Sequence, residues 1–164
     1  MNINKDTWII SDTHFGHMNM VKLCNRPLNF NERLVDGWWK TVDYDDTILH
    51  LGDLAIFFGP LGDMWADMAA GLPGNKFLIR GNHDKKESYK GFEVVPQQIV
   101  EIGYTKILFS HDPIEKKNDK DWDINIHGHL HGNVHHSYPY PLDWHRDVGV
   151  DVMGYKPQKL GELI

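Results

Sequence analysis

The sequence has little cysteine, no long apolar run and no excess of positive charge, and each absence excludes a class of protein. Its one cysteine, Cys24, cannot form an internal disulfide, which excludes a disulfide scaffold and favours a reducing compartment. No stretch approaches the roughly 18 apolar residues of a membrane span. The N-terminal "MNINKDTWII" lacks the apolar core of a signal peptide. We therefore expect a cytoplasmic protein without membrane attachment.

The charge balance argues against a long nucleic acid as partner. The formal net charge is −6, whereas a protein that grips a long phosphate backbone needs a basic face. The chain has 164 residues, of which 41% are hydrophobic, and this suffices for one compact core. We expect residues 1–164 to form a single domain.

Apolar periodicity predicts alternating strands and helices in the first half and mostly strands in the second. Strands are expected at Trp8–Ile10, "DTILHLGD" and "NKFLIRGNHD", and helices at Met18–Cys24, Glu32–Val42 and "GPLGDMWADMAAGLPG". Later strands are expected at Phe92–Val95, Gln98–Ile102, Lys106–Ser110, Asp123–His127 and Val148–Met153, with loops at Pro113–Asp121 and Asn133–Asp147. This order predicts an α/β sandwich of mixed sheets with helices outside.

What the chain does have is histidine, 11 residues of it, and several follow expected strands together with aspartate and asparagine. The clusters are Asp12-Thr-His14, Gly52-Asp53, Gly81-Asn82-His83-Asp84, Ser110-His111-Asp112 and His127-Gly-His129-Leu-His131. Sites in such folds form beyond the carboxyl ends of strands, so these clusters can converge. Residues two apart on an extended backbone also share a side, which pairs Asp12 with His14 and His129 with His131.

These residue types predict a metal site without thiolate ligands. Imidazole, carboxylate and amide oxygen favour manganese, iron, zinc or nickel over a structural zinc site. One ion cannot use all of them, but two ions about 3.5–4 Å apart can. Any one cluster alone could be a turn, because Asp12 could cap one and "GNHD" suits a type I′ hairpin. Turns do not require the whole ordered set.

The ordered set Asp-x-His, Gly-Asp, Gly-Asn-His-Asp, His and Gly-His-x-His resembles the calcineurin-like metallophosphoesterase superfamily. The resemblance spans Trp8 to His131 and continues into "VGVDVMGYKP". "SDTHFGH", followed by "NRP", is similar to the small single-domain bacterial and phage members. One departure is "GDLAI", where Ile56 stands in place of the second Asp of Gly-Asp-x-x-Asp. That Asp is not a metal ligand, so the departure bears on substrate and not on metal.

The resemblance implies a four-layer αββα sandwich of two mixed sheets flanked by helices, and it assigns roles to the motif residues. Asp12, His14 and His131 would hold a first divalent metal, and Asn82, His111 and His129 a second. Asp53 would bridge them, and His83 would be catalytic with Asp84 behind it. Mn²⁺ is the favoured ion, with iron, zinc and nickel as alternatives.

The charges of this set independently predict an anion site. Two divalent cations bring four positive charges, and Asp12, Asp53 and a bridging hydroxide remove three, which leaves about one. The expected reaction is in-line attack by that hydroxide on phosphorus, with His83 protonating the leaving oxygen. His17 and Arg26 follow the first ligand pair, and each could contact substrate phosphate or pack around the first helix.

The expected function is a phosphodiesterase for a small nucleotide-like diester. The alternatives are a nucleotide phosphomonoesterase or pyrophosphohydrolase, and a non-catalytic scaffold, which the complete ligand set disfavours. A loop with three histidines and three aromatic residues could be a surface loop or a rim that stacks on substrate; these residues are His135, His136, His145, Tyr138, Tyr140 and Trp144. Both a monomer and a homodimer fit the sequence.

Overall fold

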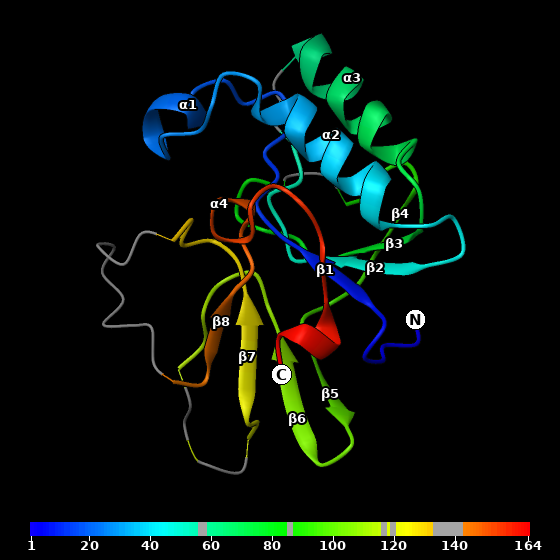
Figure 1. Ribbon diagram of the computed structural model, residues 1–164, viewed down its shortest axis with the longest axis vertical. Helices are drawn as coiled ribbons and strands as arrows, with labels where there is room; N and C mark the ends of the chain where they lie inside the picture. Colours follow the sequence, from blue (N-terminus) through cyan, green and yellow to red (C-terminus); the bar gives the residue numbers. More distant parts are fainter. Residues whose placement is uncertain (56–58, 85–86, 116–117, 119–120, 133–142) are drawn as a thin grey trace.

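The computed structural model describes residues 1–55, 59–84, 87–115, 118, 121–132 and 143–164 (Figure 1). Its strands are β1 (Trp8–Ile10), β2 (Thr47–His50), β3 (Asn75–Leu78), β4 (Phe92–Val94), β5 (Gln98–Ile102), β6 (Thr105–Phe109), β7 (Ile124–His127), β8 (His145–Asp147) and β9 (Gln158–Lys159). Its helices are α1 (Met20–Leu23), α2 (Phe30–Thr41), α3 (Gly59–Ala70) and α4 (Val150–Met153), and a 3-10 turn, η1 (Leu160–Glu162), follows β9.

Two mixed sheets form the body of the molecule, which confirms the predicted α/β sandwich. The five-stranded sheet has the order β4-β3-β2-β1-β9, with β1 to β4 parallel and β9 antiparallel at the edge. The four-stranded sheet has the order β5-β6-β7-β8, in which only β5 runs antiparallel to its neighbour. The parallel strands of each sheet therefore end on the same edge, and that edge carries the polar clusters.

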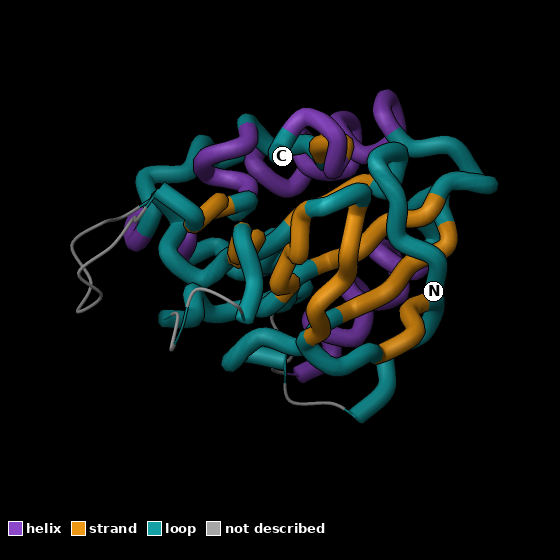
Figure 2. The backbone as a smooth tube through the Cα atoms, turned by 90° about the horizontal axis from the view of Figure 1, so that it is seen from below, coloured by secondary structure: helices purple, strands orange, loops and turns teal. Residues whose placement is uncertain are grey.

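Figure 2 shows the strands of the sandwich with helices outside them. Two apolar clusters hold these layers together. One lies between the sheets and joins Ile9 and Leu49 to Phe109 and Ile126. The other lies on the helical side of the larger sheet, where α2 buries residues four apart in sequence, as an amphipathic helix does. Within the described residues, all four helices contribute buried side chains to this second cluster, including Met20, Trp38, Ala69 and Val150.

The predicted strand Val148–Met153 is wrong, because this segment forms helix α4 and the strand, β8, lies just before it. The alternating letters of "VGVDV" suggested a strand, but Gly149 and Gly154 bound a short helical turn. Gly154 has a φ of 71°, a left-handed conformation that glycine adopts without strain. The Val150 N–H donates to the Ser11 carbonyl at 3.1 Å, so α4 lies against the end of β1.

Some of the sequence predictions fall outside the described residues. These are Ile56, part of the loop Pro113–Asp121, and the segment with His135, His136, Tyr138 and Tyr140. In the described part of the chain, no helix has the length and apolar character needed to cross a membrane.

Two strand histidines are buried in their neutral form. Burial lowers the pKa of His50 to about 3. The His50 Nδ1 accepts from the Gly52 N–H at 3.1 Å, a bond that a protonated ring could not make. Burial also lowers the pKa of His127 to about 4, against the opposing effect of a hydrogen bond to the Gly128 carbonyl. Both rings therefore stay uncharged in the fold where exposed histidines would take up a proton.

We expect acid to destabilise the protein through these residues. Each of these histidines has a pKa of about 6.5 in the unfolded chain and a lower pKa in the fold. At pH values between the two, only the unfolded chain binds the proton, so the folding stability that is present above pH 6.5 is lost as the pH falls. Each histidine costs about 1.4 kcal/mol per pH unit in that window. Urea unfolding of metal-free wild type and His127→Gln from pH 6.5 to 5.0 measures this. The difference in unfolding free energy between wild type and His127→Gln should shrink towards low pH by that amount per pH unit. A difference that stays constant with pH would contradict the neutral state of buried His127.

Candidate metal centre

The polar clusters that follow β1, β2, β3, β6 and β7 come together at one edge of the sandwich. His14 Nε2 and His111 Nε2 lie 3.4 and 3.5 Å from the same oxygen, Oδ2 of Asp53. These three residues follow three different strands, and all three are buried. The carboxylate of Asp53 thus stands between two groups of side chains that could ligate metal.

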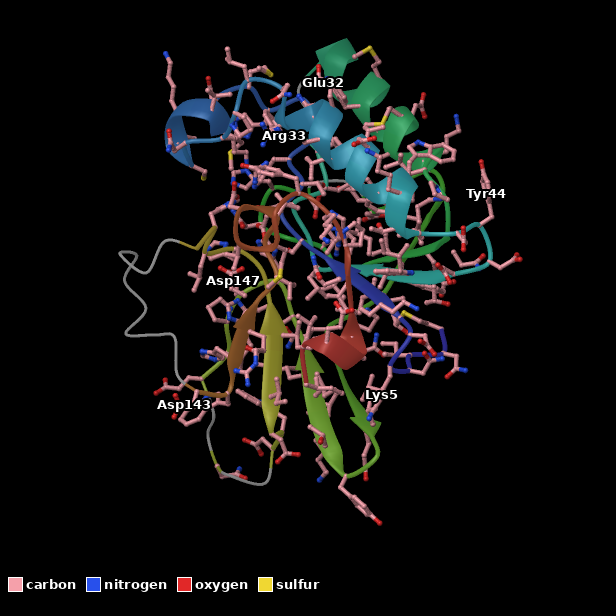
Figure 3. The ribbon with its side chains drawn as sticks, in the orientation of Figure 1. Lys5, Glu32, Arg33, Tyr44, Asp143 and Asp147 are labelled. Carbon is pink, nitrogen blue, oxygen red and sulfur yellow. The ribbon has the colours of Figure 1, made fainter. Side chains whose placement is uncertain are left out.

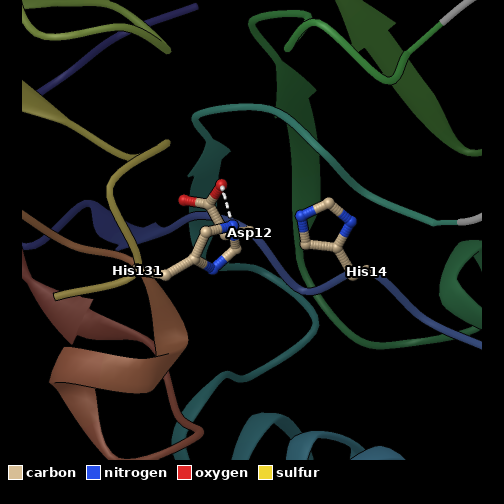
Figure 4. A group of neighbouring side chains, drawn as sticks. All are labelled: Asp12, His14 and His131. Atoms are coloured by element: carbon tan, nitrogen blue, oxygen red, sulfur yellow. Dashed lines mark ion pairs between the residues drawn. The ribbon is translucent and has the colours of Figure 1, made fainter. Parts of the chain in front are cut away.

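The first group is Asp12, His14 and His131, whose ligand atoms all lie within 4.8 Å of one another (Figure 4). Asp12 Oδ1 is 3.8 Å from His131 Nε2, and the His14 and His131 rings stack with centroids 5.1 Å apart. Carboxylate and imidazole at this spacing suit a divalent transition ion.

The second group lies on the other side of Asp53. Asn82 Oδ1 is 2.9 Å from His111 Nε2 and 3.1 Å from His129 Nδ1, and the two ring nitrogens are 3.3 Å apart. Asp112 also approaches, with Oδ1 3.4 Å from His129 Nδ1. Sequence reasoning left Asp112 out of the ligand set, although it follows His111 directly.

Buried polar atoms in the first group fit a bound cation. Within the described part of the chain, Asp12 Oδ1 and His14 Nε2 are buried without any hydrogen-bond partner. Unsatisfied buried groups of this kind are rare and costly, and a coordinated cation would satisfy both. Burial raises the pKa of Asp12 to about 6 and lowers the pKa of His14 well below its usual value. The donors therefore match a divalent metal, and they are poorly satisfied by protein alone.

The backbone at this centre is left-handed, so the premise that the paired residues lie on extended chain is wrong. Positive φ angles occur at Asp12 (59°), His14 (47°), Asp53 (56°), His129 (70°) and His131 (53°). Such angles are uncommon outside glycine and concentrate at functional sites. The backbone N–H groups of Asp12 and His14 donate to the carbonyls of Gly52 and Asp53, both at 2.9 Å. These two hydrogen bonds fix the turn after β1 against the turn after β2.

Two glycines allow the strand ends to approach. A Cβ at Gly81 would collide with the Asp53 carboxylate, and one at Gly128 would collide with Ser11 and Asp12. Any larger residue at either position would push a carboxylate out of the centre.

Asp84 has a different contact from the one expected. Its carboxylate accepts from the backbone N–H groups of Asp53 at 2.7 Å, Gly81 at 2.8 Å and Leu54 at 3.2 Å. Among the described residues, no hydrogen bond joins it to the His83 ring. Asp84 therefore ties the ends of β2 and β3 together, and its expected role behind His83 stays a prediction.

His83 and His17 face the centre from its open side. The His83 ring is 5.4 Å from the His14 ring, and the backbone N–H of His83 donates to Asp53 Oδ1 at 2.9 Å. The His17 ring is 5.6 Å from His14. Both rings line a cavity of about 430 Å³ that His14 and His131 also line. His83 is exposed, which leaves its ring free to meet a substrate.

Of the two alternatives for Arg26, the structure shows the packed one. Its buried guanidinium donates to both oxygens of Asp151, from Nε at 2.8 Å and NH2 at 2.7 Å. It also donates to the carbonyls of Asp12 at 2.7 Å and Thr13 at 2.9 Å. Asp151 in turn accepts from His131 Nδ1 at 2.8 Å. Asp151 was not selected from the sequence, and only its place in "VGVDVMGYKP" could have suggested it.

A neighbouring carboxylate anchors the same loops. Asp147, labelled in Figure 3, accepts from the N–H of Gly149 at 2.8 Å and of Gly132 at 3.0 Å. It thereby joins the loop that carries His131 to the start of α4, which carries Asp151. The orientation of the His131 ring thus depends on segments far apart in sequence.

Comparison with known proteins identifies the family. Residues 6–160 match the model of the calcineurin-like phosphoesterases. The chain belongs to this family. The resemblance noted from the motifs is therefore confirmed, and the chain is a hydrolase that acts on phosphoester bonds. The family assignment and the metal-ligating groups together support the use of divalent metal.

Individual relatives cover nearly the whole phosphoesterase chain. An uncharacterized protein of Methanocaldococcus jannaschii is 32% identical, over 96% of this chain and 88% of the relative. The Gene 66 protein of Mycobacterium phage L5 is 26% identical, over 91% of this chain and 88% of its own. The crystal structure of a protein of unknown function from Aquifex aeolicus matches with a TM-score of 0.76 and 27% identity, covering 95% of this chain and 96% of the other.

Proposed function

We propose that this phosphoesterase is a phosphodiesterase that hydrolyses a small nucleotide-like diester with two divalent metal ions. The observation that carries the proposal is the position of Asp53, whose Oδ2 lies within 3.5 Å of a histidine from each ligand group. A carboxylate in that position can serve two ions at once.

The ligand assignment follows the two groups. Asp12, His14 and His131 would hold one ion, Asn82, His111 and His129 the other, and Asp53 both. When bound, a pair of divalent cations lowers the pKa of water and polarises phosphoryl oxygens. The mixture of imidazole and oxygen donors favours Mn²⁺, with iron, zinc and nickel as the other candidates.

The chain's own residues make the centre a site for a phosphoryl anion. Asn82 supplies a neutral oxygen, so Asp12 and Asp53 are the only carboxylates in the proposed ligand set, and a positive surplus remains. His83 stands at the open side, where its ring can give a proton to the leaving oxygen. A diester suits this site because its single negative charge needs no further cationic side chain, and Arg26 is occupied by Asp151.

The test is hydrolysis of bis-p-nitrophenyl phosphate against p-nitrophenyl phosphate by wild type with and without Mn²⁺. Metal-dependent turnover that favours the diester is expected. A preference for the monoester would replace the proposal with the second candidate, a nucleotide phosphomonoesterase. Absence of turnover in protein that carries two metal ions would contradict both.

His83→Ala should separate proton donation from metal binding. We expect kcat for a diester with an unactivated alkoxide leaving group to fall by about 10²- to 10⁴-fold, because that oxygen needs a proton. The loss for p-nitrophenolate, a stable anion, should be much smaller. Steady-state kinetics on the two leaving groups measures the difference, and full kcat on the poor leaving group would show that His83 is not the donor.

A further inference from the structure

The cavity beside the metal centre has both polar and apolar lining residues. The polar ones are His14, His17, His83 and His131, and the apolar wall is formed by Met20, Leu23 and Leu130 together with Cys24. Its volume is about 430 Å³, within the range of cavities that enclose small molecules. Ligand sites typically combine apolar walls with a few polar groups that fix orientation, and this cavity has that composition.

Leu23 distinguishes the apolar wall from ordinary core packing. Met20 and Leu130 are 3% and 5% exposed, but Leu23 at the end of α1 remains 68% exposed. Helix α1 lies apart from α2 and α3 in Figure 1. Its last residue, Leu23, lines the cavity and has exposed surface for contact with a ligand. A single exposed leucine is unremarkable, yet this one faces the cavity that His83 also faces.

The place of His83 decides which part of a substrate the cavity would receive. In the function proposed above, on which this inference rests, His83 gives its proton to the leaving oxygen. The group attached to that oxygen must then lie on the His83 side of phosphorus. We infer that the cavity binds the leaving alcohol of the substrate, and that this alcohol carries a planar apolar body, such as an aryl group or a nucleobase.

The reaction that this binding mode serves is simple hydrolysis. Water adds its oxygen to phosphorus, the bond between phosphorus and the leaving oxygen breaks, and the leaving oxygen takes the proton of His83. A proton given up by the water then restores His83. The products are a phosphomonoester and an alcohol whose apolar body packs against Met20, Leu23 and Leu130. Thioether and aromatic groups make favourable contacts, which suits Met20 to a planar ring.

Two substrates and two matched variants test the inference. Bis-p-nitrophenyl phosphate and methyl p-nitrophenyl phosphate release the same leaving group but differ in the group that is retained. Leu23→Ser removes the apolar wall, and Leu28→Ser is its control, because Leu28 is 77% exposed and is not among the described residues that line the cavity. Melting temperature and Mn²⁺ affinity, measured for each protein, should match wild type.

We expect Leu23→Ser to lower kcat/KM about tenfold for both diesters by the same factor, with Leu28→Ser close to wild type. A loss confined to bis-p-nitrophenyl phosphate would place the retained group in the cavity and overturn the assignment. Equal activity of Leu23→Ser and Leu28→Ser would overturn the binding site itself. If wild type hydrolyses neither diester, the proposed phosphodiesterase function is wrong. This outcome differs from the two above, which overturn only the role of the cavity.

Discussion

Asp53→Asn is expected to abolish metal-dependent hydrolysis while the fold persists. The Asp53 carboxylate lies 3.4 Å from His14 and 3.5 Å from His111, so the change removes a negative charge that both proposed ions share. We expect Mn²⁺ affinity to fall by more than about 100-fold, beyond the effect of losing a group that only orients a ligand. The fold should persist because an amide oxygen can still accept from the backbone N–H of His83, which in the wild type donates to Asp53 Oδ1 at 2.9 Å.

Calorimetric titration with Mn²⁺ and hydrolysis of bis-p-nitrophenyl phosphate measure this prediction together. Asp36→Asn is a matched control, because among the described residues Asp36 pairs with Lys40 alone, on the exposed face of α2. That control should keep two ions and full activity. Retention of both ions and of activity in Asp53→Asn would rule out the shared carboxylate.

Arg26→Ala should lower the free energy of unfolding by about 3–5 kcal/mol. The side chain of Arg26 is 0% exposed and that of Asp151 is 7% exposed, so the change removes the guanidinium from a buried carboxylate and leaves it the contact with His131 Nδ1 at 2.8 Å. It also leaves the carbonyls of Asp12 and Thr13 without the guanidinium donors that reach them at 2.7 and 2.9 Å. Breaking one partner of a buried pair is far more costly than losing an exposed pair.

Urea unfolding in EDTA measures this effect without contribution from metal. Arg33→Ala is the matched control, since Arg33 lies exposed on α2 (Figure 3). Its side chain donates to Asn29 at 3.2 Å, and no other side-chain hydrogen bond of Arg33 occurs within the described residues. Arg33→Ala should change stability by less than about 0.5 kcal/mol. If Arg26→Ala instead raised KM and left stability unchanged, a contact with substrate phosphate would explain Arg26 better than packing.

The sequence allowed most strands and the convergence of the polar clusters to be predicted, because both depend on local patterns. Runs such as Thr47–His50 are apolar and end abruptly, and parallel strands bring such ends to one edge. Helix α4 was missed because valine alternates with glycine and aspartate there, as in a strand. What decides that segment is the docking of Val150 on the Ser11 carbonyl, a contact between residues remote in sequence.

The contacts of Arg26 and Asp151 were beyond prediction for the same reason. They lie 125 residues apart in sequence, and no spacing rule connects them. The handedness of the backbone at Asp12 and His14 could not be predicted either, because it follows from hydrogen bonds to the residues after β2. Motif spacing thus gave the identity of the candidate residues, whereas tertiary contacts give their orientation.

The residues with left-handed backbone at the metal centre strain the fold, and the same residues carry the candidate metal ligands. Each of the five non-glycine residues there would lose strain on the order of 1 kcal/mol if glycine replaced it, since glycine adopts these angles freely. Every such replacement also deletes a donor atom from the centre. A variant of this fold with glycine at these positions would therefore have less backbone strain but would lack the side chains that ligate metal. An active protein keeps those side chains together with the strain, and so stays closer to its limit of stability.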